Sequence, residues 1–206
     1  TGYVSAFPWT LFEHLAEGKP AWAPFYTYHK IMAGLLDMYL LTGNTDALQV
    51  VEGMAQWAGD YFYPIGRDQR LRMLRTEYGG MNEVLVNLAA VTKKDRYIQT
   101  AHLFEQPSFL DPLAARCDEL QGLHANTHVP KIIGAARMYE VTGDRRYRDI
   151  AQYFLAEVLT ARSYAIGNTS VDEHWTTPAD ELKGTLSLTN AECCVAYNLM
   201  KLERHV

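Results

Sequence analysis

Apolar residues recur at helical spacing in three separate stretches of the chain. In the first stretch the apolar positions are Ile31, Leu35, Met38 and Tyr39, and residues 84–91 and 132–139 repeat the pattern. This spacing places the apolar side chains on one face of a helix. A further stripe at 150, 154 and 158 marks a return helix. Alternating apolar and polar positions, the pattern of a half-buried strand, are scarce, so the sequence predicts an all-α protein.

The three stripes belong to an internal repeat. Thr42, Thr92 and Thr142 end them, so consecutive threonines are 50 residues apart. Thr42 and Thr142 are followed by Gly-Asn and Gly-Asp, which is typical of a glycine C-cap and a turn. A period near 50 also occurs in propeller blades of the kelch type, but the helical spacing argues against blades. Each repeat therefore predicts a helical hairpin that must stack on its neighbours to bury its apolar face.

The number of hairpins that the chain can hold indicates how much of a closed ring it forms. At about 50 residues each, 206 residues hold about four hairpins. Six hairpins would close a ring, so we expect residues 1–206 to form part of an (α/α)6 toroid that continues beyond the chain end. Thr1 is not an initiator Met and Val206 lies inside a predicted helix, which also favours a piece of a longer polypeptide. We expect the rest of the barrel, or another copy, to cover the open edge.

Equivalent positions of the repeat align several polar residues. The first helices of the hairpins are expected to begin near residues 27, 80, 128 and 190. In a toroid these starts gather at one mouth, where free N–H groups and loops carry function. This predicts that His29, the 77–83 loop and His128 face one cavity, together with Glu173 and Glu192.

Composition removes several classes of function. Apolar residues make up 48% and charged residues 21%, as in globular proteins. The net charge of −5 is spread without a basic stripe, which argues against nucleic-acid binding, and no apolar run approaches the length of a membrane span. Three cysteines cannot form a disulfide framework. No targeting segment is visible, and the localisation is left open.

Two stretches with acidic or thiol groups offer candidate chemistry, each with a plainer interpretation. Glu192 and Cys194 are of the ligand types that zinc accepts, although free cysteine more often packs as a small apolar residue. Glu173 lies in a polar loop next to Trp175, which could raise the pKa of a carboxyl group for acid catalysis, although a solvated acid is commoner.

The other candidates are polar groups near predicted helix starts. Residues 124–128 read His-Ala-Asn-Thr-His, in which Asn126 or Thr127 could instead cap a helix. His29 follows three aromatic residues, and its plainer interpretation is a core histidine. The candidates for sugar contact among these stretches are His29, Asn82, His124, Asn126 and His128.

Four stretches in a fixed order resemble one family. They are Tyr-Thr-Tyr-His-Lys at 26–30, Gly-Gly-Met-Asn-Glu at 79–83, His-Ala-Asn-Thr-His at 124–128 and Glu-Cys-Cys at 192–194. This pattern resembles the β-L-arabinofuranosidase-like glycoside hydrolases of families 127 and 146. The resemblance covers essentially the whole chain and implies an (α/α)6 barrel, in agreement with the repeat.

The resemblance also implies a mechanism. It implies a retaining, zinc-dependent glycosidase for β-L-arabinofuranosides of plant-type glycans, whose nucleophile is a cysteine thiolate. By resemblance Glu192 and Cys194 are zinc ligands and Glu173 is the general acid/base, with Asp172 in place of the family's glycine. The family's nucleophile belongs to a downstream Cys-Cys pair, which Cys193 and Cys194 are not. We therefore expect weak or no zinc binding and no activity from residues 1–206 alone.

Two other functions stay open from the sequence. One is a non-catalytic helical module that binds a saccharide or pairs with another chain. The other is a sugar epimerase, since such enzymes share helical toroids and histidines at the mouth. An epimerase has no need for Glu173 together with the Glu192–Cys194 pair.

Overall fold

The computed structural model describes residues 2–206. They divide into two compact units, and the boundary along the chain falls between Gln106 and Pro107. Helices form both units, and the described residues contain isolated β-bridges but no strand. Residues 2–206 also contain no helix with both the length and the apolar character needed to cross a bilayer. The predicted all-α class is confirmed.

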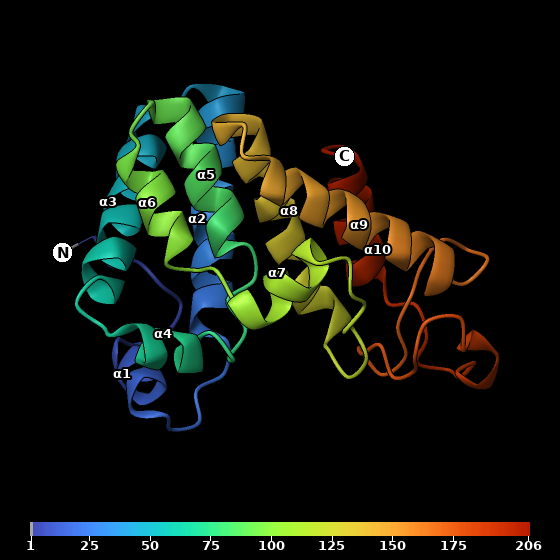
Figure 1. Ribbon diagram of the computed structural model, residues 1–206. Helices are drawn as coiled ribbons and strands as arrows, with labels where there is room; N and C mark the ends of the chain where they lie inside the picture. The colour runs from blue at the N-terminus through green and yellow to red at the C-terminus, as the bar shows by residue number, and fades with distance from the viewer. Residues whose placement is uncertain (1) are drawn as a thin grey trace. The chain divides into compact units, whose positions relative to one another are not determined.

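The first unit contains two helical hairpins and two short helices (Figure 1). Its helices are α1 (Thr10–Glu17), α2 (Pro24–Thr42), α3 (Thr45–Phe62), α4 (Arg67–Met73), α5 (Met81–Thr92) and α6 (Arg96–His102). Helix α2 packs on α3 and α5 packs on α6, while α2 and α5 lie side by side. Aromatic rings fill the core, where Phe25 contacts Phe12, Phe62 and Phe104 at centroid distances of 4.9, 4.8 and 5.1 Å.

The second unit contains one hairpin and a further helix that packs on it. Its elements are α7 (Pro107–Ala114), α8 (Ala125–Thr142), α9 (Arg145–Ala161), the 3-10 turn η1 (Leu182–Gly184) and α10 (Cys193–Glu203). Helices α8 and α9 form the hairpin, and α10 packs on α8. The long connection from α9 to α10 carries the candidate acid Glu173.

The repeat predicted from the threonines is present in the structure. Each threonine is the last residue of its helix, and its hydroxyl donates to the carbonyl oxygen four residues earlier. The residues that follow adopt the left-handed conformation that ends a helix: Gly43 with φ 72°, Lys93 with φ 58° and Gly143 with φ 76°. The first helices begin at 24, 81, 125 and 193, within three residues of the predicted positions.

Candidate functional site

A tight turn presents Glu173. The backbone N–H groups of Val171 and His174 each donate to the other residue's carbonyl, at 3.0 and 2.9 Å. The two residues between them, Asp172 and Glu173, have φ values of 45° and 66°. Positive φ at both central positions is the type I′ turn, which favours glycine, asparagine or aspartate at the first of them. Aspartate at position 172 is therefore compatible with this turn.

The same turn is tied to the start of α8. The Ala125 N–H donates to the carbonyl oxygen of Glu173 at 2.7 Å, and the Trp175 N–H donates to that of Leu123 at 3.1 Å. The Glu173 carboxylate lies 3.2 Å from Nε2 of His124, at Oε2. The Glu173 side chain is 54% exposed while that of His124 is 21% exposed, so the carboxylate faces solvent with a histidine at its side.

Trp175 anchors the turn from the inside. Its ring is buried and packs edge-on against Phe154 at a centroid distance of 5.9 Å. Its Nε1 donates to the hydroxyl of Thr169 at 3.0 Å. The ring lies in the core, and the side chain that contacts the Glu173 carboxylate is the His124 imidazole.

Sequence reasoning missed a second anchor, the buried pair Arg162–Asp118. Nε of Arg162 donates to Asp118 Oδ2 at 2.7 Å, and Nη1 donates to the carbonyl of Thr177 at 2.8 Å. Arg162 is 3% exposed. Its guanidinium therefore ties the connection that carries Glu173 to the segment before α8. Asp118 stands in an acidic stretch that looks exposed in sequence, so no local signal identifies this pair.

His128 lies in the first turns of α8 as a neutral imidazole. Its Nδ1 donates to the carbonyl oxygen of His124 at 2.7 Å. Burial, reinforced by the positive charge of Lys131, lowers the pKa of His128 to about 3. Because Nδ1 carries the proton, Nε2 holds a lone pair that accepts a hydrogen bond.

One expectation about this segment is wrong. Helix α8 begins at Ala125 after His124, so Asn126 and Thr127 lie inside the helix and neither caps it. Pro130 also lies inside the helix. Asn126 has another contact: its Oδ1 accepts from Nδ2 of buried Asn198 at 2.8 Å, which links α8 to α10.

Glu192 and Cys194 lie together at the start of α10. Glu192 is the residue before the helix, and the Cys194 thiol donates to its Oε2 at 3.5 Å. Burial and then this hydrogen bond raise the pKa of the Cys194 thiol. A thiol and a carboxylate this close fit two positions of a zinc site, whose ligands are sulfur, nitrogen and oxygen atoms. The described residues hold no group of three or more His, Cys, Asp and Glu side chains arranged for a metal.

The remaining candidates, His29 and Asn82, lie in the first unit. Both are buried, His29 in α2 and Asn82 in the first turn of α5. A Cβ on Gly79 would lie 2.3 Å from Cε1 of His29, so the imidazole packs directly on the glycine backbone. The structure thus brings His29 to the Gly79–Gly80 loop, as the repeat predicts. Glu83, also in the first turn of α5, is buried, and its Oε2 lies 3.1 Å from the position that a Cβ on Gly80 would take.

The candidates therefore fall into two groups. In the second unit the structure brings Glu173 to His124, His124 to His128, and Glu192 to Cys194. In the first unit it brings His29 to the loop before Asn82. The shared cavity of the two groups stays a prediction.

Comparison with known proteins bears on the identity of this arrangement. No curated protein sequence matches the chain. The family model described as β-L-arabinofuranosidase, GH127 catalytic domain, matches residues 1–206. That match spans both groups of candidate residues. The chain belongs to the GH127 catalytic-domain family, which is a family of glycoside hydrolases of the β-L-arabinofuranosidase type.

Proposed function

We propose that the chain carries the general acid/base of a retaining, zinc-dependent glycosidase that acts on β-L-arabinofuranosides of plant-type glycans. One observation carries the proposal: the Glu173 carboxylate is half exposed on a doubly anchored turn, with His124 at 3.2 Å. A catalytic acid must be both reachable by substrate and fixed in direction. Glu173 meets both requirements.

In this proposal Glu173 acts as the general acid and then as the general base of the reaction. As the acid it donates a proton to the leaving glycosidic oxygen, and as the carboxylate it later removes a proton from water. His124 holds the carboxylate from one side. The neutral imidazole of His128 accepts a hydrogen bond from a sugar hydroxyl at Nε2. His29, Asn82, His124 and Asn126 are proposed to make further contacts with the sugar.

Glu192 and Cys194 are the residues proposed to hold zinc. Bound zinc keeps a sulfur ligand deprotonated near neutral pH, which makes a strong nucleophile available. The nucleophilic cysteine in this proposal lies outside residues 1–206. Two ligands do not complete a tetrahedral site, so residues 1–206 alone should bind zinc weakly and hydrolyse no substrate.

Glu173→Gln in the active enzyme tests the acid. With a poor leaving group kcat should fall by roughly 10²- to 10⁴-fold, because the proton donor is lost, while activated aryl β-L-arabinofuranosides should lose far less. Asp172→Asn is the matched control in the same turn, since asparagine also tolerates positive φ. It should leave both rates near normal. An equal loss on both substrates would show that Glu173 is not the acid.

Cys194→Ser tests the zinc ligand. Zinc content, measured by metal analysis of the purified enzyme, should fall together with activity because a ligand is removed. Cys193→Ser is the control, since the neighbouring side chain is exposed and has no proposed role. Unchanged zinc content in Cys194→Ser would remove Cys194 from the site.

A further inference from the structure

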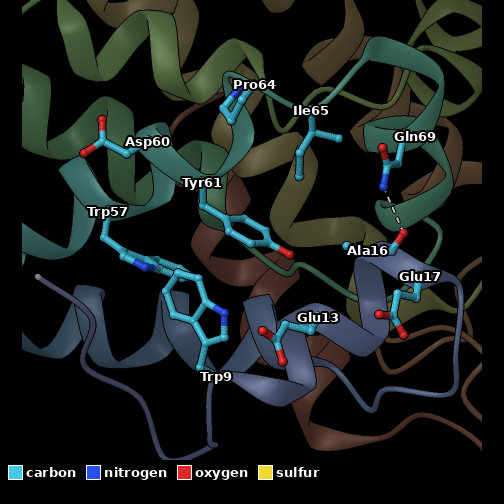
Figure 2. A pocket seen from close by; sticks show the side chains of 10 residues that line it. All are labelled: Trp9, Glu13, Ala16, Glu17, Trp57, Asp60, Tyr61, Pro64, Ile65 and Gln69. Carbon is cyan, nitrogen blue, oxygen red and sulfur yellow. Dashed lines mark hydrogen bonds between the residues drawn. The ribbon is translucent and has the colours of Figure 1, made fainter.

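A cavity of about 510 Å³ opens in the first unit beside α1, the end of α3 and the start of α4. Figure 2 shows the side chains that line it. They are Trp9, Glu13, Ala16, Glu17, Trp57, Asp60, Tyr61, Pro64, Ile65 and Gln69. None of these is a candidate for the glycosidase chemistry above, and the volume is in the range of small-molecule sites.

Aromatic rings form one wall of this cavity. Trp57 and Tyr61 are stacked, with centroids 5.3 Å apart and planes at 15°. Trp9 stands edge-on to both rings, at 5.1 and 5.7 Å. Trp57 is buried, whereas Trp9 is 40% exposed. Part of the Trp9 indole is therefore open to a ligand.

Every charged residue that lines the cavity is acidic. Glu17 pairs with Lys19 at 2.6 Å, but within the described residues neither Glu13 nor Asp60 forms an ion pair. Asp60 accepts only a neutral hydrogen bond, from Gln56 at 2.7 Å. Burial and then the negative charge of Glu13 raise the pKa of Tyr61 to about 12.

Most hydrogen-bond donors of the lining are either engaged within the protein or covered by it. The Tyr61 hydroxyl donates to the carbonyl oxygen of Phe12 at 2.7 Å. The Gln69 amide donates to that of Ala16 at 3.0 Å, drawn as a dashed line in Figure 2. Within residues 2–206, Nε1 of Trp57 is buried without a hydrogen-bond partner and is closed to a ligand. Apart from the Trp9 indole N–H, the cavity thus offers mainly carboxylate acceptors and aromatic faces, and it favours a ligand that donates hydrogen bonds.

We propose that this cavity binds an organic cation, namely a guanidinium or ammonium group on an apolar stem, as in an arginine or lysine side chain. Such a group has donors and no acceptors, and its positive charge matches Glu13 and Asp60. The faces of Trp9 and Tyr61 add a cation–π attraction, while Pro64 and Ile65 contact the stem. A neutral sugar could stack on the same rings and donate hydroxyl hydrogen bonds to the carboxylates, but it would leave their negative charge uncompensated.

Nα-acetyl-L-argininamide is the probe, and calorimetry together with tryptophan fluorescence measures its binding. Its uncharged isostere, Nα-acetyl-L-citrullinamide, and L-arabinose are the comparison ligands. The cationic probe should bind, and its affinity should fall as the salt concentration rises. Its affinity should exceed that of the citrulline isostere by at least threefold. Glu13→Gln and Asp60→Asn should each weaken binding by roughly two- to fivefold. Trp9→Ala should weaken it by roughly two- to thirtyfold.

Asp37→Asn is the matched control, since Asp37 is an exposed carboxylate of α2 in the same unit and does not line the cavity. It should leave the affinity unchanged, and circular dichroism checks that every variant is folded. Equal affinity for the citrulline isostere, binding of L-arabinose alone, or binding that Glu13→Gln and Asp60→Asn leave unchanged would each overturn the proposal. Because all readouts are of binding, the result is independent of the glycosidase tests.

Discussion

The charge state of His128 is decided by its surroundings. The buried imidazole donates from Nδ1 to the carbonyl oxygen of His124, and burial lowers its pKa from 6.5 to about 3. A free histidine titrates near pH 6.5. Between pH 6.5 and 3, His128 therefore binds a proton in the unfolded chain but stays neutral in the folded protein. The corresponding stabilisation is complete above pH 6.5 and is lost as the pH falls toward 3.

His128→Asn tests this linkage. Asparagine keeps a donor near the Nδ1 position but cannot titrate. Between pH 6 and 4 the free energy of unfolding of the wild type should fall more steeply than that of the variant, by up to about 1.4 kcal/mol per pH unit. Urea unfolding at several pH values measures both slopes. Parallel slopes would mean that His128 is protonated in the folded protein.

Gly79 is constrained by a neighbour as well as by its own backbone. Its φ is +54°, and an added Cβ would lie 2.3 Å from Cε1 of His29. Gly79→Ala should therefore lower the free energy of unfolding by about 2–4 kcal/mol, from backbone strain and overpacking together. Chemical denaturation measures the loss.

Gly43→Ala separates these two causes. Gly43 has a φ of +72°, but nothing lies within 4 Å of the Cβ that alanine would add. This variant should lose only the strain contribution, about 1 kcal/mol. Similar losses of stability at both positions would show that the added Cβ at position 79 is accommodated by His29 without a packing penalty.

At the scale of elements, the hairpins are alike in the first helix and differ where the second helix begins. Asn44 and Asp144 cap α3 and α9, accepting from the backbone N–H groups of Ala47 and Arg146, each at 2.9 Å. Asp95 holds the same place before α6 and makes no side-chain cap hydrogen bond. The caps are therefore a property of two repeats out of three.

Asp144→Ala should lower the free energy of unfolding by about 0.5–2 kcal/mol, because the Arg146 N–H loses its acceptor. Asp95→Ala is the matched substitution at the equivalent position and should change stability by only a few tenths of a kcal/mol. Thermal or urea unfolding of the two variants compares them. The prediction fails if Asp95→Ala is as destabilising as Asp144→Ala.

At the scale of the molecule, the proposed chemistry is distributed over two compact units. Glu173, Glu192 and Cys194 all lie in the second unit, where the α9–α10 connection and the start of α10 carry them. His29 and Asn82 lie in the first unit, each in the first turns of a hairpin's leading helix. Each unit has its own apolar core. The family match extends across both, so neither unit alone represents the catalytic domain.

The periodic part of this protein is determined by the sequence itself. The apolar stripes, the turn glycines and the threonines at 42, 92 and 142 predict the hairpins and their boundaries to within three residues. They do so because helix geometry and helix termination are local: side chains three or four residues apart share a face, and glycine ends a helix at positive φ. The same alignment of repeats predicts that His29 and the 77–83 loop face one cavity, and in the structure His29 packs on Gly79 of that loop.

Only the tertiary structure decided the environment of the candidate acid. The α9–α10 connection has no period, so the type I′ turn at Asp172–Glu173, the approach of Glu173 to His124 and the burial of Arg162 on Asp118 have no signal in sequence. The neutral state of His128 likewise depends on burial, which the order of residues alone does not specify. The Arg162–Asp118 and Glu173–His124 contacts join residues 44 and 49 positions apart, and desolvation and hydrogen bonding between such distant segments exist only once the chain has folded.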